Sequence, residues 1–294
     1  MSEPTAEHRT RQESWTVLKT LSWITGYLRD KGVENARREA EWLLCEASGL
    51  DRMGLYLNFD KPLQENELVF LRGLVTRRGK REPLQYLLGT QEFAGLEFMV
   101  SPAALIPRHD TEVLVGEAVR RMPHPRTILD IGTGSGCIAI ALARRQPGAV
   151  VTAVDLSEEA LAVAQRNAAL HAVEIEFLQG SYFEPVSQRR FDLIISNPPY
   201  IPTADLADLQ PEVRDYEPRL ALDGGPDGLA AYRKLTEKAG NHLHDGGCLV
   251  VEVGIGQAVQ VTELFQAADF DAIVQVPDQA GILRVVGGIW HEAR

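Results

Sequence analysis

The chain has 294 residues, a formal net charge of −11 and 45% apolar residues. This length suggests one or two domains with an ample core, and the acidic balance excludes a protein whose whole surface binds nucleic-acid phosphates. Its 3 widely spaced cysteines form no CxxC pair, which argues against disulfides and zinc and favours a reducing cytoplasm. We expect no signal peptide or membrane span, because no apolar run approaches about 18 residues. Residues 1–12 are polar, and we expect them to be disordered.

Apolar side chains at helical spacing dominate the first part of the chain. They predict helices over residues 13–32, 35–48 and 64–79, the first ended by Gly32 and the second by Gly49. Residues 13–85 are therefore predicted to form a small helical bundle. Basic residues gather near the end of its last helix: Arg72, Arg77, Arg78, Lys80 and Arg81. Cations that offset the helix dipole are the favoured interpretation, and a partner-binding patch is the alternative.

Residues 86–108 change in character and suggest a linker between two domains. A short hairpin is expected to begin at Tyr86, and Pro102 and Pro107 stiffen the extended connector that follows it. Asp110 is a good N-cap for the next expected helix.

From residue 127 the sequence alternates between strand and helix patterns. This alternation predicts an α/β fold with a doubly wound, mostly parallel sheet, closed by an antiparallel pair. The expected strands are 127–131, 149–154, 175–178, 191–196, 248–253, 272–276 and 283–286, and the expected helices are 137–145, one capped by Ser157, 229–243 and 257–268.

A glycine-rich turn, Gly132-Thr133-Gly134-Ser135-Gly136, separates the first of these strands from its helix. Glycines there let the backbone approach a ligand and present free N–H groups at a helix N-terminus. Asp155 ends the next strand, where a carboxylate can accept both hydroxyls of a ribose. Cys137 stands where a dinucleotide fingerprint needs glycine, and Gly-x-Gly-x-Gly is the variant associated with S-adenosylmethionine. The turn alone is a weak signal, because a structural turn or a nucleotide site would look similar.

The stretch Asn197-Pro198-Pro199-Tyr200 follows a buried strand and is the candidate site of chemistry. The two prolines end the strand and hold an amide side chain and a carbonyl at its carboxyl end, where open α/β sheets bind ligands. The Asn197 amide oxygen and the Pro198 carbonyl are acceptors that suit an NH2 group on a planar carbon, and Tyr200 offers a flat face for packing. Holding that nitrogen in line with an electrophile is catalysis by positioning. An ordinary proline-rich turn is about as probable for this motif on its own.

Taken together, the motifs resemble those of the class I S-adenosylmethionine-dependent methyltransferases. Over about residues 14–290 the chain is most similar to the bacterial release-factor glutamine N5-methyltransferases. The resemblance includes the helical N-terminus, residues 101–112, the glycine turn, Asn197 to Tyr200 and the stretch from Ala221 to Leu229. It implies a seven-stranded Rossmann-like methyltransferase sheet over 109–294, behind a hairpin linker at 86–108 and a release-factor-binding bundle at 13–85.

The resemblance also implies an activity and a role for each motif. The substrate would be the glutamine of the Gly-Gly-Gln motif in class 1 peptide chain release factors, and the cofactor S-adenosylmethionine. Gly132 to Gly136 would line the methionine moiety, Asp155 would hold the ribose and Tyr182 would lie beside the adenine. Asn197 to Tyr200 would bind the glutamine, with Asn197 also at the cofactor. We expect a cytoplasmic monomer without a metal.

Two departures from the family pattern stand out. Ser181 occupies a position where the family often has an acid, and His109 replaces a proline. An exposed or helix-capping role is favoured for His109 over acid–base chemistry. A DNA adenine methyltransferase is the first alternative, but it needs a basic groove that the charge of −11 disfavours. A ribosomal-protein glutamine methyltransferase and a non-catalytic protein of the same fold are the others.

Overall fold

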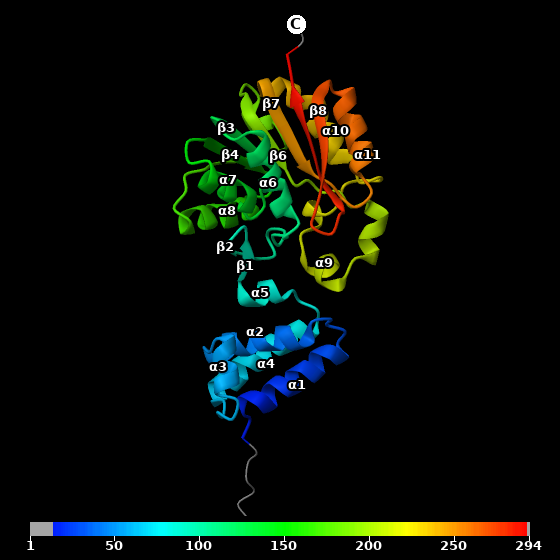
Figure 1. Ribbon diagram of the computed structural model, residues 1–294. Helices are drawn as coiled ribbons and strands as arrows, with labels where there is room; N and C mark the ends of the chain where they lie inside the picture. The colour runs from blue at the N-terminus through cyan, green and yellow to red at the C-terminus, as the bar shows by residue number, and fades with distance from the viewer. Residues whose placement is uncertain (1–13, 293–294) are drawn as a thin grey trace, which may run out of the picture. The chain divides into compact units, whose positions relative to one another are not determined.

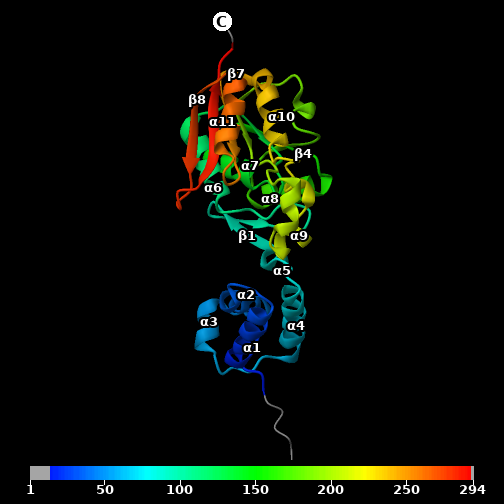
Figure 2. The same cartoon turned by 90° about the vertical axis from the view of Figure 1, so that its right-hand side faces the viewer.

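The computed structural model describes residues 14–292 and divides into two compact units, Met1–Leu88 and Gly89–Arg294. Each unit has its own hydrophobic core. Figures 1 and 2 show the helices and strands of which each unit is built. The expectation that residues 1–12 are disordered lies outside the described residues. No helix within residues 14–292 is long and apolar enough to cross a membrane.

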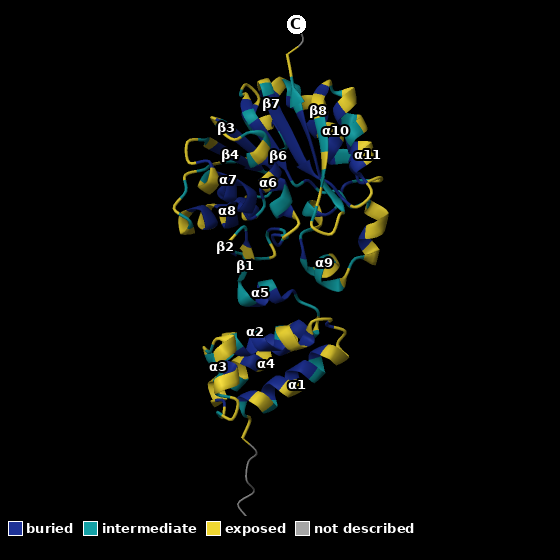
Figure 3. Ribbon diagram, in the orientation of Figure 1, coloured by how far each residue is buried: buried dark blue, intermediate teal, exposed yellow. Residues whose placement is uncertain are grey.

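The first unit is a helical bundle, as the apolar spacing predicts. The structure confirms the three expected helices and adds two short ones, which at five or six residues are too brief to show a periodic pattern. Leu28, Leu43 and Leu44 are fully buried in the core of this unit, and each such burial contributes about 1.5–3 kcal/mol. Buried and exposed residues alternate along α1 and α2 (Figure 3). The helices are α1 (Val17–Asp30), α2 (Ala36–Ser48), α3 (Arg52–Leu57), α4 (Glu65–Gly79) and α5 (Leu84–Leu88).

The basic cluster at the end of α4 is engaged within this unit. Arg78 is buried and pairs with Glu39, while Arg77 pairs with Glu82. Arg81 donates a hydrogen bond to the carbonyl of Gly32. These contacts fit cations that close a helix end.

The second unit begins with a hairpin, β1 (Thr90–Phe93) and β2 (Leu96–Met99), paired with Thr90 opposite Met99. The prediction that this hairpin begins at Tyr86 is wrong, because residues 86–88 belong to α5. Pro83 fixes the first turn of that helix, and its carbonyl accepts hydrogen bonds from the N–H groups of Tyr86 and Leu87. The helix after the connector is α6 (Thr111–Arg121). Asp110 precedes it as expected, but its side chain makes no capping hydrogen bond and pairs with Arg284.

A seven-stranded sheet forms the centre of this unit, with strand order β5-β4-β3-β6-β7-β9-β8. The first five of these strands are parallel, and β9 is antiparallel to both of its neighbours. This confirms the predicted doubly wound methyltransferase sheet. The strands are β3 (Thr127–Ile131), β4 (Val150–Asp155), β5 (Glu176–Gln179), β6 (Phe191–Ser196), β7 (Leu243–Glu252), β8 (Phe270–Pro277) and β9 (Leu283–Trp290).

Helices cover both faces of the sheet (Figures 1 and 2). On β6, Leu193 and Ile195 enter one core while Ile194 enters the other, as the alternation of side chains along a strand requires. Helices α6, α7 and α8 contribute to the first core, and α10 and α11 to the second. Their bounds, with the short α9, are α7 (Cys137–Arg145), α8 (Glu158–Leu170), α9 (Pro211–Tyr216), α10 (Ala230–Ala239) and α11 (Ala258–Ala267).

Candidate active site

The sheet brings the predicted motifs to one edge. Strands β4, β3, β6 and β7 are adjacent and parallel, so their carboxyl ends lie side by side. Gly132 follows β3, Asp155 ends β4, Asn197 follows β6 and Glu252 ends β7. The chain order reverses between β4 and β6 on either side of β3, which is the switch point where open α/β sheets bind ligands.

The glycine turn leaves open space at two of its three glycines. Gly132, Gly134 and Gly136 adopt φ values of 74°, 56° and 81°, which residues with side chains rarely adopt. A Cβ atom at Gly132 or Gly134 would meet no other atom within 4 Å, whereas one at Gly136 would lie 3.0 Å from the Cβ of Ala164 in α8. Gly136 therefore permits helix packing, and the other two form a backbone cradle with room for a ligand.

The polar side chains of this turn face the protein interior. Thr133 and Ser135 are both buried, so this turn can meet a ligand only through its backbone. The Thr133 hydroxyl donates a 2.6 Å hydrogen bond to Asp130 Oδ2. Cys137, the first residue of α7, is also buried, and burial raises the pKa of its thiol to about 12.

Asp130 is a buried acid beneath the turn that sequence analysis did not single out. Its burial raises its pKa to about 7, and the nearby charge of Asp155 acts in the same direction. Its Oδ1 atom has no well-aligned hydrogen-bond partner within residues 14–292, although the N–H of Ala139 lies near the carboxyl group. An acid that interrupts an apolar strand just before a glycine turn is the signal that could have identified it.

Asp155 holds the turn from the neighbouring strand. Its Oδ2 accepts a hydrogen bond from Gly134 N at 2.8 Å, and its Oδ1 accepts one from Ser157 N at 2.9 Å. Burial raises the pKa of this carboxyl, and the backbone hydrogen bonds oppose that rise. Each oxygen keeps capacity for a further donor, so the carboxylate can also bind a diol.

Tyr182 lies beyond β5, the strand beside Asp155, and the Gly180 N–H donates to the Asp155 carbonyl at 3.0 Å. Its φ of 51° is left-handed, a strain of about 1–3 kcal/mol that is typical of functional sites. The ring is half-buried, and the ammonium group of Lys234 lies 5.0 Å from its centroid. The preceding Ser181 contributes its backbone N–H to Glu184.

The Asn197 turn presents two acceptors that no other group uses. Asn197 Nδ2 donates to the Thr111 hydroxyl at 3.2 Å. Within residues 14–292, nothing donates a hydrogen bond to Asn197 Oδ1 or to the carbonyl of Pro198. Pro198 is buried and Pro199 half-buried, so the backbone of this turn is held by packing as well as by its fixed φ angles.

Gln257 supports the end of this turn. Its Nε2 donates to the Tyr200 carbonyl at 2.8 Å, and its Oε1 accepts from Gly254 N at 3.0 Å. A Cβ atom at Gly228 would lie 2.4 Å from the Tyr200 carbonyl, so the loop that precedes α10 must carry glycine there. Burial raises the pKa of Tyr200 to about 12, which keeps its hydroxyl neutral. Gln257 and Gly228 were not predicted to act at the site.

Glu252 is the fourth strand-end residue, and it too was missed. It is 2% exposed, and burial raises its pKa to about 7 although Thr111, Arg284 and Asn197 oppose that rise. The strand predicted over residues 248–253 includes Glu252. A single acid within an apolar run does not indicate which residues surround it in the folded sheet.

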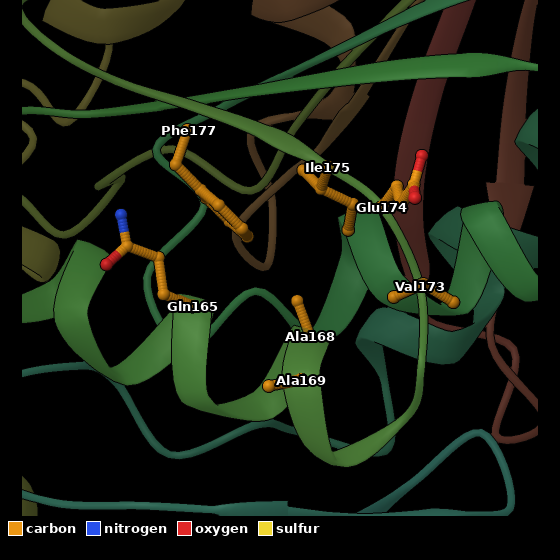
Figure 4. Close-up of a pocket in the computed structure, with 7 residues that line it drawn as sticks. All are labelled: Gln165, Ala168, Ala169, Val173, Glu174, Ile175 and Phe177. Atoms are coloured by element: carbon orange, nitrogen blue, oxygen red, sulfur yellow. The ribbon is translucent and has the colours of Figure 1, made fainter.

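His109 is exposed, and a hollow in the second unit is lined by none of the predicted site residues. The His109 side chain is 73% exposed and contacts Glu112 Oε1 at 3.1 Å, which matches the exposed role favoured from the sequence. A hollow of about 440 Å³ lies between α8 and the start of β5, where Gln165 and Ala168 face Ile175 and Phe177 (Figure 4). No predicted site residue lines it.

Comparisons with known proteins agree with this architecture. The family described as "PrmC N-terminal domain" matches residues 19–89, and "Methyltransferase small domain" matches residues 109–209. The chain is 60% identical over 278 residues to the release factor glutamine methyltransferase of Geobacter sulfurreducens, covering 95% of this chain and 98% of that protein. For the enzyme of the same name from Moorella thermoacetica the identity is 46% over 271 residues, covering 90% and 95%.

One solved structure supports the fold alone. A methyltransferase from Pyrococcus furiosus superposes with a TM-score of 0.51 and 19% identity, covering 68% of this chain and 91% of that one.

Proposed function

The chain belongs to the release factor glutamine methyltransferases, and from this premise we propose how its residues carry out the reaction. It is a protein-glutamine N5-methyltransferase that uses S-adenosylmethionine and acts on release factors. The glutamine of the Gly-Gly-Gln motif in class 1 factors is the proposed acceptor. The observation that carries this proposal is the pair of unused acceptors, Asn197 Oδ1 and the Pro198 carbonyl, at the edge of the sheet beside the glycine turn.

The residues around the glycine turn fit S-adenosylmethionine. When bound, this cofactor supplies an electrophilic methyl group on a sulfonium. The open positions at Gly132 and Gly134 leave room for its methionine part against the backbone of residues 132–136. The spare acceptor capacity of Asp155 suits the ribose hydroxyls, and the presented ring of Tyr182 suits the adenine. Asn197 borders the same space from the next strand.

The Asn197 turn supplies orientation rather than acid–base chemistry. An amide nitrogen is a poor nucleophile because its lone pair is delocalised into the carbonyl. Asn197 Oδ1 and the Pro198 carbonyl would accept hydrogen bonds from the two N–H groups of the glutamine side chain. These hydrogen bonds would fix the amide nitrogen with one face of the amide plane toward the methyl group. Pro199 and Tyr200 would pack against the planar amide. The Tyr200 hydroxyl, with a pKa of about 12, is not a base at neutral pH, and none is needed before transfer because the methylated nitrogen is acidic.

We further propose that the helical bundle binds the release factor. Several large apolar side chains of this unit are exposed, and Trp15 and Trp23 contact each other edge to face at 6.2 Å. Exposed aromatic groups of this kind mark protein-binding surfaces. The exposed residues are Trp15, Leu18, Trp23, Met53, Tyr56, Leu57, Phe59, Val69 and Phe70.

The test of the function is methyl transfer from labelled S-adenosylmethionine to three substrates. These are a class 1 release factor, the same factor with its Gly-Gly-Gln glutamine replaced by alanine, and duplex DNA. We expect label on the first alone. Label on the alanine variant would move the target to another residue, and label on DNA would favour an adenine methyltransferase. The domain proposal is tested by Trp23→Ala, which should impair transfer to the whole factor but not to a short Gly-Gly-Gln peptide.

A further inference from the structure

Glu252 lies directly beside the Asn197 turn. The parallel register pairs Ser196 of β6 with Val251 of β7, so the next residues, Asn197 and Glu252, lie side by side where the two strands end. Glu252 is 2% exposed, and its Oε2 atom has no hydrogen-bond partner within residues 14–292. Burying a carboxyl group costs free energy unless neighbouring groups pair with it or donate hydrogen bonds to it.

The Glu252 side chain is not held by an ion pair. Arg284 is the nearby cation, but its guanidinium pairs with Asp110 at 2.9 Å and with Asp278 at 3.0 Å. Among the described residues no salt bridge includes Glu252. The Tyr232 hydroxyl donates to the backbone carbonyl of Glu252 at 2.9 Å, which fixes the main chain and leaves the carboxyl group for other partners.

The groups that do face the carboxyl are donors of the site itself. Asn197 Nδ2 donates to the Thr111 hydroxyl at 3.2 Å, and both side chains are close enough to the Glu252 carboxyl to lower its pKa. A hydroxyl can accept from one group while it donates to another. Thr111 can therefore accept from the Asn197 amide and direct its own proton toward Glu252, so that the NH2 end of the amide is held on the protein side.

This arrangement decides which end of the Asn197 amide meets the substrate. Turning an asparagine side chain by 180° exchanges its acceptor oxygen for its donor nitrogen. In the turned form, the NH2 of Asn197 would face the NH2 of the glutamine, and two donors would meet. We propose that Glu252 is a positioning residue that, with Thr111, keeps Asn197 Oδ1 turned toward the substrate. Its effect on turnover rests on the function proposed above.

The variants Glu252→Leu, Glu252→Gln and Thr111→Val separate this role from simple packing. Glu252→Leu fills the space without an acceptor, and we expect kcat to fall about 10- to 100-fold, the loss typical of a stranded polar partner. Glu252→Gln keeps an acceptor oxygen and should rescue most of the rate. Thr111→Val should resemble Glu252→Leu. In all three the affinity for S-adenosylmethionine, measured by calorimetry, should stay close to wild type.

A matched control and a double variant sharpen this test. Glu117→Gln removes another buried carboxylate, which pairs with Arg120 at 2.7 Å on α6, six residues after Thr111, and should leave kcat unchanged. In the Asn197→Ala background, Glu252→Leu should cost nothing further in residual rate. Equal losses in both backgrounds, a loss in the Glu117 control as large as in Glu252→Leu, or full activity of Glu252→Leu would each overturn the proposal.

Hydrogen exchange of the Asn197 side-chain amide can also be measured without any substrate. In 15N-labelled protein its NH2 protons should exchange slowly with water, and Glu252→Leu should speed that exchange. Equal exchange rates in wild type and variant would refute the positioning role. Because this measurement needs no methyl transfer, it still decides the proposal if the release factor proves not to be the substrate.

Discussion

Glu41 in the helical bundle and Glu252 in the catalytic unit are both buried glutamates at 2% exposure, yet their surroundings are opposite. Glu41 accepts hydrogen bonds from Tyr56 at 2.6 Å and from Arg52 at 2.8 Å. Burial alone would raise the pKa of Glu41, but these donors lower it overall. Glu252 keeps an oxygen without a partner, and its pKa rises to about 7. An acid whose oxygens accept hydrogen bonds stabilises its unit, whereas an acid with an unpaired oxygen at a strand end indicates a functional site.

The largest expected effect comes from the residue that Glu252 faces. Asn197→Ala removes one of the two acceptors for the glutamine, and we expect kcat to fall by about 10²–10³, as when a group that stabilises a transition state is lost. Single-turnover methyl transfer measures it, and calorimetry should show a much smaller change in cofactor affinity. Loss of cofactor binding with normal turnover at saturation would contradict this role.

Asp155 is intermediate between the two glutamates, because hydrogen bonds use only part of its acceptor capacity. Its two backbone hydrogen bonds leave capacity for a ligand, so Asp155→Ala should weaken the binding of S-adenosylmethionine by about 1–3 kcal/mol. Asp223→Ala is a suitable control, because the Asp223 carboxylate accepts hydrogen bonds from Thr203 and from the N–H of Gly225, in the loop that precedes α10. Unchanged affinity in Asp155→Ala, measured by calorimetry, would remove this residue from the cofactor site.

The two glutamates should differ in the sign of their effect on stability. At pH 8, Glu41→Leu strands its donors and should lower the free energy of unfolding by about 1–3 kcal/mol. Glu252→Gln removes a buried charge and should leave that free energy unchanged or higher. Urea unfolding followed by circular dichroism measures both. If both variants lowered the free energy of unfolding by a similar amount, the two glutamates would not differ in their effect on stability.

The two glutamates should also differ in pH dependence. The folded pKa of Glu252, about 7, lies above its unfolded value, so its contribution to stability is present at low pH and is lost as pH rises through about 7. The pKa of Glu41 is lowered, so its contribution is present above the unfolded value and is lost as pH falls through the lower folded one.

The comparison of wild type with Glu252→Gln isolates this difference. The stability of wild type relative to the variant should decline between about pH 5 and pH 8, by at most about 1.4 kcal/mol per pH unit. A difference that is flat across this range would mean that Glu252 does not titrate there. Asp130, whose pKa is also about 7, is present in both proteins and cancels.

The elements with strong local signals could be predicted residue by residue. Strands β3 and β6 and helix α7 begin and end at the expected residues, because glycine, proline and apolar runs mark both of their ends. Strand β7 begins at Leu243 rather than 248, since Leu243 pairs with Phe191 only in the folded sheet and residues 244–247 are polar or glycine. The short α9 lies in a polar segment without periodicity, and it was not expected.

The candidate site shows the same limit. The glycine turn, Asp155 and Asn197 could be found because each is a motif that is contiguous or lies at a strand end. Glu252 and Gln257 could not, because they reach the Asn197 turn only through the order of the strands and the register of β6 with β7. Groups that touch ligands leave motifs in a sequence, whereas groups that support them are defined by the fold.

The buried thiol of Cys137 has a practical consequence. This cysteine directly follows the glycine turn, yet burial and a pKa of about 12 keep it protonated, and the thiolate is the form that alkylating reagents and oxidants attack. Cys248 is likewise buried, with a pKa of about 11, so the half-buried Cys45 of the bundle is the accessible thiol. Burial also raises the pKa of Cys45, so a maleimide dye would label the bundle selectively through exposure rather than through a reactive thiolate. The two buried thiols of the catalytic unit would resist alkylation and oxidation.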